Sequence, residues 1–273
     1  MPDRDELSGL RAENARLIAL LESHGIQWRP PQPVVLVARE PEPEPSKLST
    51  AEKVALFRRL FRGRTDVYPI RWEGKTSGKT GYAPACANEW RAGVCEKPRI
   101  KCGDCSNRLL IPLSDAVIYD HLAGEHTVGV YPLLEDDSCY FLAVDFDEAE
   151  WRDDARAFMK SCDELGVPAA LEISRSGNGA HAWVFFVSRV SARDARRLGT
   201  AIITHTCART RQLKLESYDR LLPNQDTMPK GGFGNLVALP LQKHARDAGH
   251  SVFVDTDLQP WPDQWVFLAR HAQ

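Results

Sequence analysis

The sequence predicts an α+β fold built around a largely antiparallel sheet. After about residue 127, strand-like and helix-like segments follow one another in the order β-β-α-β-β-α-β. Two successive strands between helices are typical of antiparallel pairing, whereas a doubly wound sheet needs strict alternation of strand and helix. Of the 273 residues, 43% are hydrophobic and 26% are charged, so the chain has enough apolar side chains for a core.

The N-terminal segment, residues 1–28, predicts a helix over residues 5–24 with a heptad-like apolar seam. The seam is typical of a parallel coiled-coil dimer with a polar residue at one core position, and a short amphipathic helix docked on its own domain fits it equally well. Residues 29–48 follow as a proline-rich linker, which is extended where prolines are dense. The seam residues are Leu7, Leu10, Asn14, Leu17, Leu21 and His24.

One domain is expected over residues 49–265, with a short C-terminal tail over residues 266–273. The domain opens with a helix capped at Ser49, where Glu52 three residues later can complete a capping box. The further elements expected are strands at 66–72, 127–133, 139–146, 169–174, 180–187, 235–240 and 251–255, and helices at 113–123, 150–165 and 191–213.

A pair of acids ends the apolar strand at 139–146. In a strand, residues i and i+2 share a face, so Asp145 and Asp147 project together while Phe146 points away. Two adjacent carboxylates repel each other unless a cation lies between them, and Mg²⁺ or Mn²⁺ prefers oxygen ligands and bridges phosphates. The pair therefore indicates a site for divalent ions of the kind used in nucleotidyl transfer. Ordinary strand-end acids that cap the next helix are the alternative interpretation.

A polar, glycine-bearing loop joins the next two predicted strands. Its glycines let backbone N–H groups approach a phosphate, and Ser176 and Asn178 add donors. Arg175 adds a positive charge, and His181 at the start of the following strand can donate to a triphosphate. These four residues are our candidates for nucleotide binding. A simple hairpin turn with a structural histidine is the alternative.

The polar segment before the strand at 235–240 offers a third acid. Asp226 is the preferred candidate for a position beside the first two acids, and Asp219 is its competitor. Lys243 and His244, just past the strand, can meet the same triphosphate. A long surface loop without function is the alternative, although loops of this length without structure are uncommon.

Four of the seven cysteines fall within residues 86–105. A Cys-x2-Cys pair is a usual half-site for zinc, and four thiolates make a closed tetrahedral structural site. A chance cluster of buried thiols and an iron–sulfur cluster are the alternatives. The proposed Zn²⁺ ligands are Cys86, Cys95, Cys102 and Cys105.

Basic and aromatic side chains lie between these cysteines. On a knuckle stiffened by a metal they suit a nucleic-acid backbone, although a solvated rim has the same composition. The net charge of −2 shows that any such contact has to be local. The candidates for nucleic-acid contact are Arg91, Lys97, Arg99 and Lys101.

The chain lacks the signals of membrane insertion and export. No apolar run approaches the roughly 20 residues that span a bilayer, and the N-terminus lacks the apolar core of a signal peptide. We expect a cytoplasmic protein whose thiols are reduced or bound to metal.

Three motifs together resemble the archaeo-eukaryotic primase superfamily: the Asp145/Asp147 pair, the Gly-Ala-His run ending at His181, and Asp226. The more detailed likeness is to the primase-polymerase domain of TOTE conflict systems, and it covers roughly residues 50–265. The segments that carry it are SRSGNGAHAW, LLPNQD, GGFGNLVALPLQ and the cysteine segment.

The resemblance implies an RRM-like catalytic core paired with an N-terminal α/β lobe. It also implies two divalent ions held by the three acids, and a nucleoside triphosphate contacted by the histidine. The chain departs from the family at Gly179, because the family often has serine two residues before the histidine. A hydroxyl would then come from Ser174 or Ser176 instead.

The expected function is a DNA primase or polymerase that makes or extends a strand on a template by a two-metal mechanism, within a mobile-element conflict or defence system. Its expected partners are a DNA or RNA template and primer, nucleoside triphosphates, a helicase or nuclease of the same system, and a second copy joined through the N-terminal helix. The alternatives are a two-metal nuclease and a catalytically inactive, zinc-containing nucleic-acid-binding module.

Overall fold

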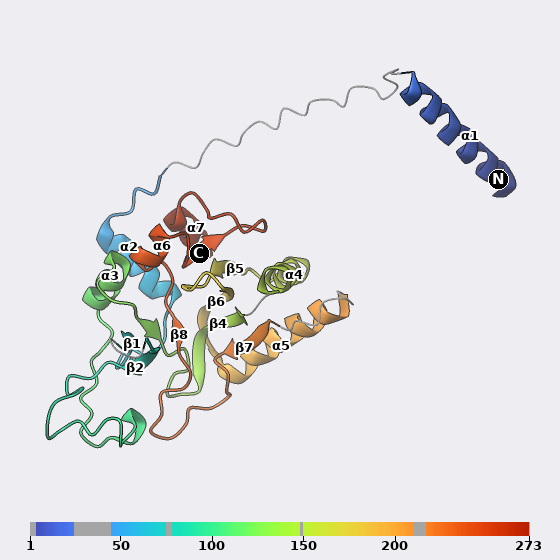
Figure 1. The fold of residues 1–273 in the computed structure, drawn as a ribbon. Helices are drawn as coiled ribbons and strands as arrows, with labels where there is room; N and C mark the ends of the chain where they lie inside the picture. Colours follow the sequence, from blue (N-terminus) through green and yellow to red (C-terminus); the bar gives the residue numbers. More distant parts are fainter. Residues whose placement is uncertain (1–3, 25–44, 75–77, 148–149, 210–216, 273) are drawn as a thin grey trace. The chain divides into compact units, whose positions relative to one another are not determined.

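The chain divides into two units, Met1–Glu42 and Pro43–Gln273 (Figure 1). Among the described helices, none is both long enough and apolar enough to cross a membrane. The computed structural model describes residues 4–24, 45–74, 78–147, 150–209 and 217–272.

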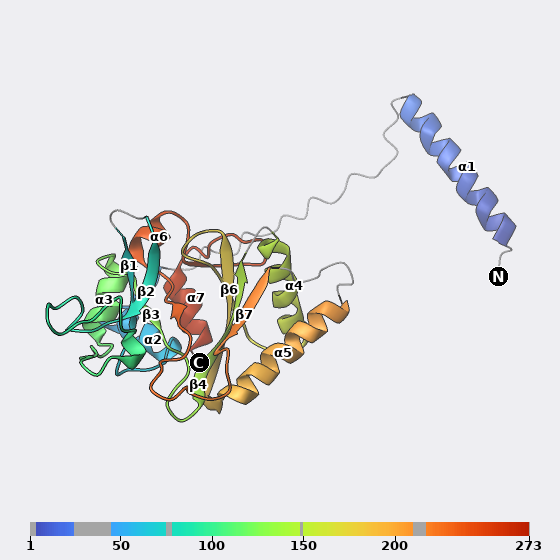
Figure 2. The ribbon, with the colours of Figure 1, turned by 60° about the horizontal axis from the view of Figure 1, so that its bottom comes forward.

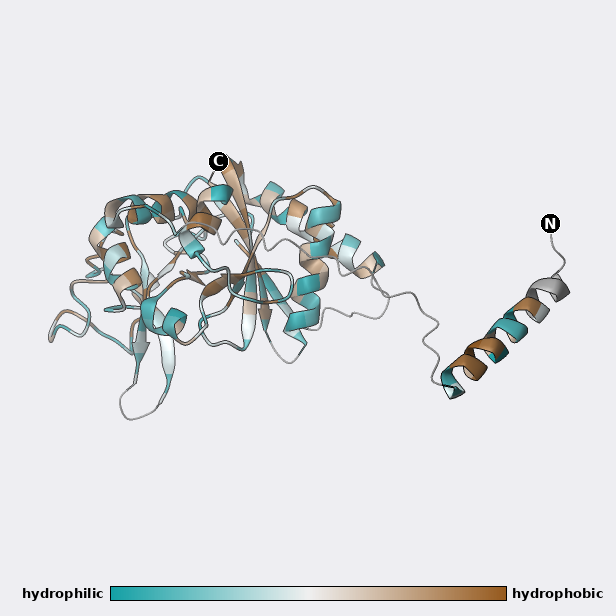
Figure 3. Cartoon of the chain, turned by 90° about the horizontal axis from the view of Figure 1, so that it is seen from above, coloured by the Kyte–Doolittle hydropathy of each residue, from teal (hydrophilic) through white to brown (hydrophobic). Residues whose placement is uncertain are grey.

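The first unit contains α1 (Arg4–Ser23), which matches the helix expected at residues 5–24. Large apolar side chains of this helix are open to solvent, with Leu10 62% and Leu20 51% exposed. Figure 3 shows apolar and polar residues along the helix. A coiled-coil partner would cover such side chains, so the coiled coil stays a prediction. The expected linker, residues 29–48, lies mostly outside the described residues.

The second unit is built on a five-stranded sheet whose neighbouring strands are all antiparallel. This arrangement confirms the predicted α+β class and the antiparallel sheet. In spatial order the strands are β7 (Tyr218–Leu222), β4 (Ser138–Asp147), β6 (Gly179–Ser191), β5 (Ala170–Ile173) and β9 (Val252–Val254).

Two helices connect four of these strands, α4 (Trp151–Glu164) and α5 (Ala192–Arg209). The chain order is β4-α4-β5-β6-α5-β7, and the sheet orders these four strands as fourth, first, third, second. This is the split βαβ arrangement of ferredoxin-like domains. It makes the first and third strands, β4 and β6, central neighbours.

Both connecting helices cover the same side of the sheet (Figure 2). Phe146 of β4 packs against Phe158 of α4, with ring centroids 5.6 Å apart. At Gly199 of α5, an added Cβ would lie 2.8 Å from the side chain of Leu221 in β7. The absence of a side chain at this position therefore lets α5 approach the sheet closely.

The opposite side of the sheet is covered by α2 (Thr50–Leu60) and α7 (Gln264–His271) (Figure 2). The predicted capping box is present, since the Ser49 N–H donates to the Glu52 carboxylate at 2.8 Å and the Glu52 N–H donates to the Ser49 hydroxyl at 3.3 Å. Phe61, just past α2, packs edge-on against Trp183 of β6 with ring centroids 4.9 Å apart.

The expectation of a C-terminal tail at residues 266–273 is wrong, because α7 occupies most of this segment. Phe267 is 9% exposed and Leu268 is fully buried. The Phe267 ring lies 5.4 Å from that of Phe253 in β9. The helix is therefore part of the domain core. The sequence did not predict it because its apolar run is short.

A smaller set of elements forms the lobe on the α7 side (Figure 2). Its two-stranded sheets pair β1 with β2 and β3 with β8. The strands expected at 127–133 and 235–240 do pair, but over only two residues each. The elements are β1 (Pro69–Glu73), β2 (Thr80–Pro84), the 3-10 turn η1 (Cys102–Asp104), α3 (Asp115–Ala123), β3 (Gly129–Val130), β8 (Val237–Ala238) and α6 (Lys243–Asp247).

His121 of α3 ties this lobe together from a fully buried position. Its Nε2 lies 2.9 Å from the Pro240 carbonyl oxygen, and its Nδ1 lies 3.2 Å from the Val128 backbone nitrogen. The Val128 N–H donates to Nδ1, so the ring is neutral and donates from Nε2. Burial lowers the pKa of His121 to about 4, and Arg246 adds to this effect against the opposing hydrogen bond to Pro240.

Candidate metal and nucleotide site

Asp145 and Asp147 project from the end of β4 on the sheet face that turns away from α4. Phe146 between them is buried against α4, and alternate residues of a strand point to opposite faces. In the register with β6, Asp145 faces His181 and Asp147 faces Gly179. The acid pair and the histidine predicted from the sequence therefore share one face of two neighbouring strands.

A third acid, Asp219 of β7, completes the group. Single carboxylate oxygens of Asp145, Asp147 and Asp219 all lie within 4.8 Å of one another. The cause is a register shift in the pairing of β4 with β7: Arg220 pairs with Asp145 and Tyr218 pairs with Phe146, which leaves Asp219 as an extra residue. A bulge of this kind turns a side chain out of the regular alternation, and here it turns Asp219 toward the two acids.

The structure does not bring Asp226 to this group, so the preference for Asp226 over Asp219 is corrected. β7 ends at Leu222, and Asp226 lies in the loop beyond it. Its carboxylate pairs with α5 instead, 2.5 Å from the Arg196 guanidinium and 3.7 Å from Nε of Arg193.

The three carboxylates concentrate negative charge at one place. Burial raises the pKa of Asp145, and the charges of Asp147 and Asp219 raise it further, against the opposing effects of His181 and Arg220. Asp219 also forms an ion pair with Arg220. A cluster of oxygen ligands with this repulsion suits a hard divalent cation, which would relieve it.

His181 lies between two carboxylates. Its Nδ1 is 3.0 Å from Oε2 of Glu172, and its Nε2 is 3.5 Å from Oδ1 of Asp145. Burial alone would lower the pKa of His181, but the charge and hydrogen bond of Glu172, with Asp145 and Asp147, raise it to about 9. The ring is therefore positively charged at neutral pH, and one edge of it faces the acid cluster.

Glu172 of β5 was not identified from the sequence. It is only 1% exposed, in a strand that otherwise reads as an apolar segment. A carboxylate in a buried strand has to be paired, because an isolated buried charge is costly. That single charged residue between apolar neighbours was the signal that could have revealed it.

The loop between β5 and β6 is shaped by its glycines. Gly177 has a φ of +77°, and an added Cβ there would lie 2.4 Å from Nε2 of His250. At Gly179 a Cβ would lie 2.6 Å from the Asp147 carboxylate and 3.4 Å from the Ser174 hydroxyl. Gly179 therefore leaves room for Asp147, and the Ser174 hydroxyl lies beside the position that a serine at 179 would fill.

The two serines of this loop lie together. The hydroxyl oxygens of Ser174 and Ser176 are 3.1 Å apart, and the Asn178 N–H donates to Ser176 at 3.2 Å. The expectation that hydroxyls near the histidine come from Ser174 or Ser176 thus has a geometric basis.

Arg175 lines an open pocket between this loop and the smaller lobe. Arg71 of β1, which pairs with Glu73, and His244 of α6 line the same pocket, so basic side chains converge on it from separate elements. Lys243 does not line it and pairs with Asp247 at 2.6 Å. The short helix α6 turns His244 rather than Lys243 toward the pocket. The remaining lining residues are Glu73, Gly124, Glu125, His126, Thr127, Gln242 and Ala245.

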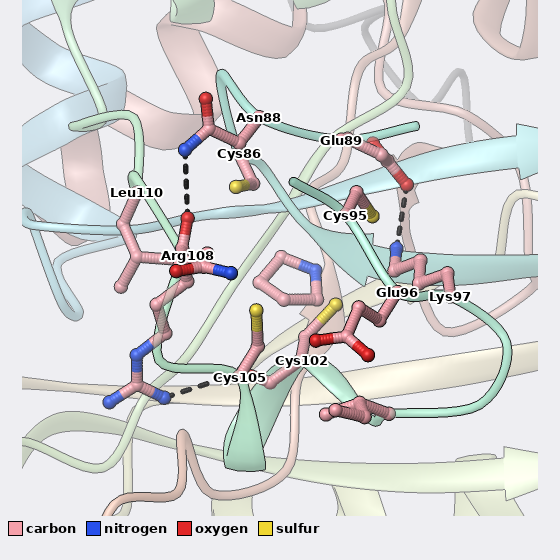
Figure 4. Close-up of a pocket in the computed structure, with 13 residues that line it drawn as sticks. Cys86, Asn88, Glu89, Cys95, Glu96, Lys97, Cys102, Cys105, Arg108 and Leu110 are labelled. Atoms are coloured by element: carbon pink, nitrogen blue, oxygen red, sulfur yellow. Dashed lines mark hydrogen bonds and ion pairs between the residues drawn. The ribbon is translucent and has the colours of Figure 1, made fainter. Parts of the chain in front are cut away.

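The four cysteines of segment 86–105 line one small cavity (Figure 4). The cavity has a volume of about 20 Å³, which is room for a single water-sized particle. The Leu109 N–H donates to Sγ of Cys86 at 3.3 Å. All four thiols are free of disulfides. Within the described part of the chain no three of their sulfur atoms lie within 4.8 Å of one another, so they line a cavity without the close spacing of the acids.

The basic residues of the cysteine segment divide into two kinds. Arg91, Arg99 and Lys101 are exposed, although Arg99 also pairs with Glu96. Lys97 is half-buried and pairs with Glu89 at 2.7 Å. Arg91, Arg99 and Lys101 are therefore the more open of the four candidates for nucleic-acid contact.

These features define an α+β protein with a three-carboxylate centre and a histidine on the adjacent strand, next to a glycine-bearing loop. The family model described as the archaeo-eukaryotic primase domain of the TOTE conflict system matches residues 52–273, and the chain belongs to this family. Membership makes it a primase-type nucleotidyltransferase domain.

One solved structure that is similar to this chain is the polymerase domain of Mycobacterium tuberculosis ligase D in complex with DNA. The identity is 13%, the TM-score is 0.42, and the match covers 82% of this chain and 84% of that chain. No curated protein matches the sequence.

Proposed function

We propose that this chain is a DNA primase-polymerase that makes or extends a nucleic-acid strand on a template, using two divalent ions. The observation that carries the proposal is the convergence of Asp145, Asp147 and Asp219 within 4.8 Å of one another, on the face that also bears His181. The chemistry of nucleotidyl transfer consists largely of positioning and charge neutralisation, which a rigid acid cluster on adjacent strands supports.

The three carboxylates are the proposed ligands of Mg²⁺ or Mn²⁺. When bound, such ions lower the pKa of the attacking hydroxyl and neutralise the charge of the triphosphate and the departing pyrophosphate. The strands hold the ligands in place: Asp145 and Asp147 by the alternation of β4, and Asp219 by the bulge in β7. We expect metal to bind weakly until a triphosphate arrives, because the triphosphate oxygens supply further ligands to the ions.

The proposed nucleotide-binding residues surround the β5–β6 loop. His181 donates from Nε2 toward the triphosphate, and Ser174, Ser176 and Asn178 offer further donors. Arg175 contributes charge from the adjoining pocket together with Arg71, and His244 offers a further donor there. His250 and Asp147 occupy the space that side chains at Gly177 and Gly179 would fill, so these glycines let the loop pack closely beside the acid cluster.

The proposed role of the cysteine segment is to bind one structural Zn²⁺ through Cys86, Cys95, Cys102 and Cys105. Four thiols around one cavity, with a backbone N–H donated to Cys86, supply the ligands of a closed zinc site, and their sulfur atoms would draw closer together on binding one ion. Elemental analysis of the purified protein should find about one zinc per chain. Intact folding without any bound metal would contradict this assignment.

The proposed nucleic-acid contact runs over the basic residues of the same segment, of which Arg91, Arg99 and Lys101 are exposed. Backbone contacts of this kind weaken with salt, because they release counterions. We further propose that the domain works with a helicase or nuclease of a conflict system, and that α1 joins two copies.

The test is extension of a labelled primer on a template, with Mg²⁺ or Mn²⁺ and with deoxynucleotides or ribonucleotides in separate reactions. The wild type should extend the primer, and Asp145→Asn should lower the rate by at least about 1,000-fold because a metal ligand is lost. His181→Ala should raise the nucleotide KM. Asp153→Asn is the matched control, since this exposed acid lies on α4 and pairs with Arg156.

Two other outcomes would replace the proposal. A primer that is shortened by the wild type and spared by Asp145→Asn would indicate a two-metal nuclease. An inactive binding module would give a different pair of results. The folded wild type would incorporate no nucleotide with either metal, and Asp145→Asn would bind DNA as well as the wild type does.

A further inference from the structure

Glu172 is a buried carboxylate that the proposed chemistry does not use. It is 1% exposed and lies in β5 directly opposite His181 of β6. A buried carboxylate without partners is strongly unfavourable, so its presence requires that its interactions compensate for the lost hydration.

Three donors converge on the two oxygens of Glu172. Oε2 lies 3.0 Å from Nδ1 of His181 and 2.9 Å from Nε1 of Trp183, and Oε1 lies 3.4 Å from the Ser251 hydroxyl. Trp183 belongs to β6, and Ser251 immediately precedes β9. The carboxylate is therefore held by donors from both of the strands that flank β5.

The tryptophan that holds Glu172 is itself immobilised. Trp183 is fully buried, and its ring lies 5.2 Å from Phe141 and 4.9 Å from Phe61, centroid to centroid. Its ring also stands edge-on to the His181 ring at 5.8 Å. Packing thus fixes Trp183, Trp183 fixes Glu172, and Glu172 holds one nitrogen of His181.

The consequence for His181 is a defined orientation. A histidine has two nitrogens, and the partner of one determines where the other points. With Nδ1 bound to Glu172, Nε2 is directed to the acid cluster, 3.5 Å from Oδ1 of Asp145. Glu172 itself lies on the far side of the ring from that cluster.

We propose that Glu172 is the positioning residue of His181: through its hydrogen bond to Nδ1 it presents Nε2 to the nucleotide site, and the bond from Trp183 keeps it in place. The proposal rests on the proposed function of the site in binding a nucleoside triphosphate. Glu172 acts through His181 and does not contact the nucleotide.

Three substitutions of Glu172 separate positioning from a general structural role. Glu172→Gln keeps an oxygen that can accept from both His181 and Trp183, and an amide that can donate to Ser251. Glu172→Met fills a similar volume but accepts no hydrogen bond. Glu172→Asp keeps the acceptor but withdraws it by one methylene, and it serves as the second test if Glu172→Met fails to fold.

The measurement is steady-state primer extension with nucleotide KM and kcat determined separately, for each variant with folding checked by circular dichroism. Glu172→Met should raise the nucleotide KM by about tenfold, as expected for loss of one oriented hydrogen bond, with a smaller change in kcat. Glu172→Asp should give an intermediate rise, and Glu172→Gln should restore KM to within about threefold of the wild type.

A double-mutant cycle with His181→Ala tests the route of the effect. If Glu172 acts through His181, Glu172→Met should add no further rise in KM to His181→Ala. A wild-type KM in folded Glu172→Met or Glu172→Asp would overturn the proposal. So would multiplicative effects of Glu172→Met and His181→Ala on KM.

An activity-independent readout separates this proposal from the function on which it rests. In a nitrogen-edited NMR spectrum, the His181 Nδ1 proton should give a slowly exchanging signal, assigned by its loss in His181→Ala. Glu172→Met should abolish that signal, and Glu172→Gln should keep it. If the NMR signal behaves in this way but the wild type incorporates no nucleotide, the result would count against the proposed polymerase function and not against the positioning role. Persistence of the signal in Glu172→Met would count against the positioning role.

Discussion

The acid cluster and the cysteine segment are two candidate metal sites that the fold builds in different ways. The acids come from neighbouring strands of one sheet, and their oxygens lie within 4.8 Å of one another. The four cysteines come from one irregular stretch of chain, and they line a cavity with wider spacing. A sheet fixes side chains by its register, whereas the cysteine segment is held mostly by local turns, whose backbone hydrogen bonds join residues three or four positions apart.

On the proposed assignments, the two sites would use metal for different purposes. Strand pairing already assembles the acids, so the proposed ions would serve the chemistry and not the fold. The cysteine segment would gain rigidity from the proposed zinc, because a structural zinc contributes directly to folding free energy. Four predictions, from the largest expected effect to the smallest, test this contrast, and a fifth measurement tests the acid site itself.

Removal of zinc should loosen the cysteine segment and leave the sheet intact. With a chelator, or with Cys102→Ser, backbone amides in residues 86–110 should exchange hydrogen at least about 100-fold faster, because local opening loses its opposing metal bonds. Amides of β4 and β6 should keep their protection. Cys207→Ser is the control, since this exposed cysteine lies on α5. Equal loss of protection in both regions would break the contrast.

Acid should weaken the smaller lobe through His121. Its pKa is about 4 in the folded protein, mainly because of burial, against about 6.5 when unfolded. The unfolded state therefore takes up a proton first, so stability is full above pH 6.5 and falls as the pH drops toward 4, by about 3 kcal/mol in total. Denaturant unfolding as a function of pH measures this loss. His121→Gln should flatten the slope in that range, and an unchanged slope would contradict the assignment.

Gly179→Ala should distort the acid site without abolishing the fold. An added Cβ would lie 2.5 Å from the Phe146 carbonyl oxygen and 2.6 Å from the Asp147 carboxylate, so β4 and β6 have to separate locally. Overpacking of this kind costs about 1–3 kcal/mol of unfolding free energy, which thermal unfolding measures. Primer-extension activity should fall even where the variant stays folded, because Asp147 is displaced. Gly103→Ala in the cysteine segment is the control, because nothing lies within 4 Å of its added Cβ.

Arg108 should contribute a smaller amount by docking the cysteine segment on the loop after β7. Its guanidinium donates to the Gly231 carbonyl at 3.1 Å and lies 5.4 Å from the Phe233 ring centroid. Arg108→Met should cost about 1 kcal/mol of stability, because it loses the bond to Gly231, the bond to the Gly103 carbonyl at 3.0 Å and the cation–π contact at a partly exposed site. Urea unfolding measures it, and a difference below the error of the method would show that the segment does not depend on this contact.

The parts of the site that the sequence predicted are those that follow simple alternation. Asp145, Asp147 and His181 lie where the period of two and the order of the strands direct them. Asp219 was only the second choice for the third acid, because its position depends on a one-residue bulge in β7, a strand that lies in a polar segment. Glu172 was not identified because its partners, Trp183 and Ser251, become its neighbours only when β5 pairs with β6 and β9.

The end of the chain depends on tertiary packing in the same way. Lys243 and His244 are adjacent in sequence, and the turn of α6 places His244 in the pocket with Arg175. Residues 266–273 carry too short an apolar run to predict a core helix, although Leu268 is fully buried. Local pattern thus predicted the central strands, and tertiary packing decided the rest.

The central claim is that Asp219, and not Asp226, completes the catalytic acid cluster. The most direct test compares Asp219→Asn with Asp226→Asn in primer extension at saturating Mg²⁺ or Mn²⁺, with folding checked for both. Asp219→Asn should lower the rate by at least about 1,000-fold, because a metal ligand is lost, while Asp226→Asn should stay within about threefold of the wild type. The opposite pattern, an active Asp219→Asn and an inactive Asp226→Asn, would contradict the account.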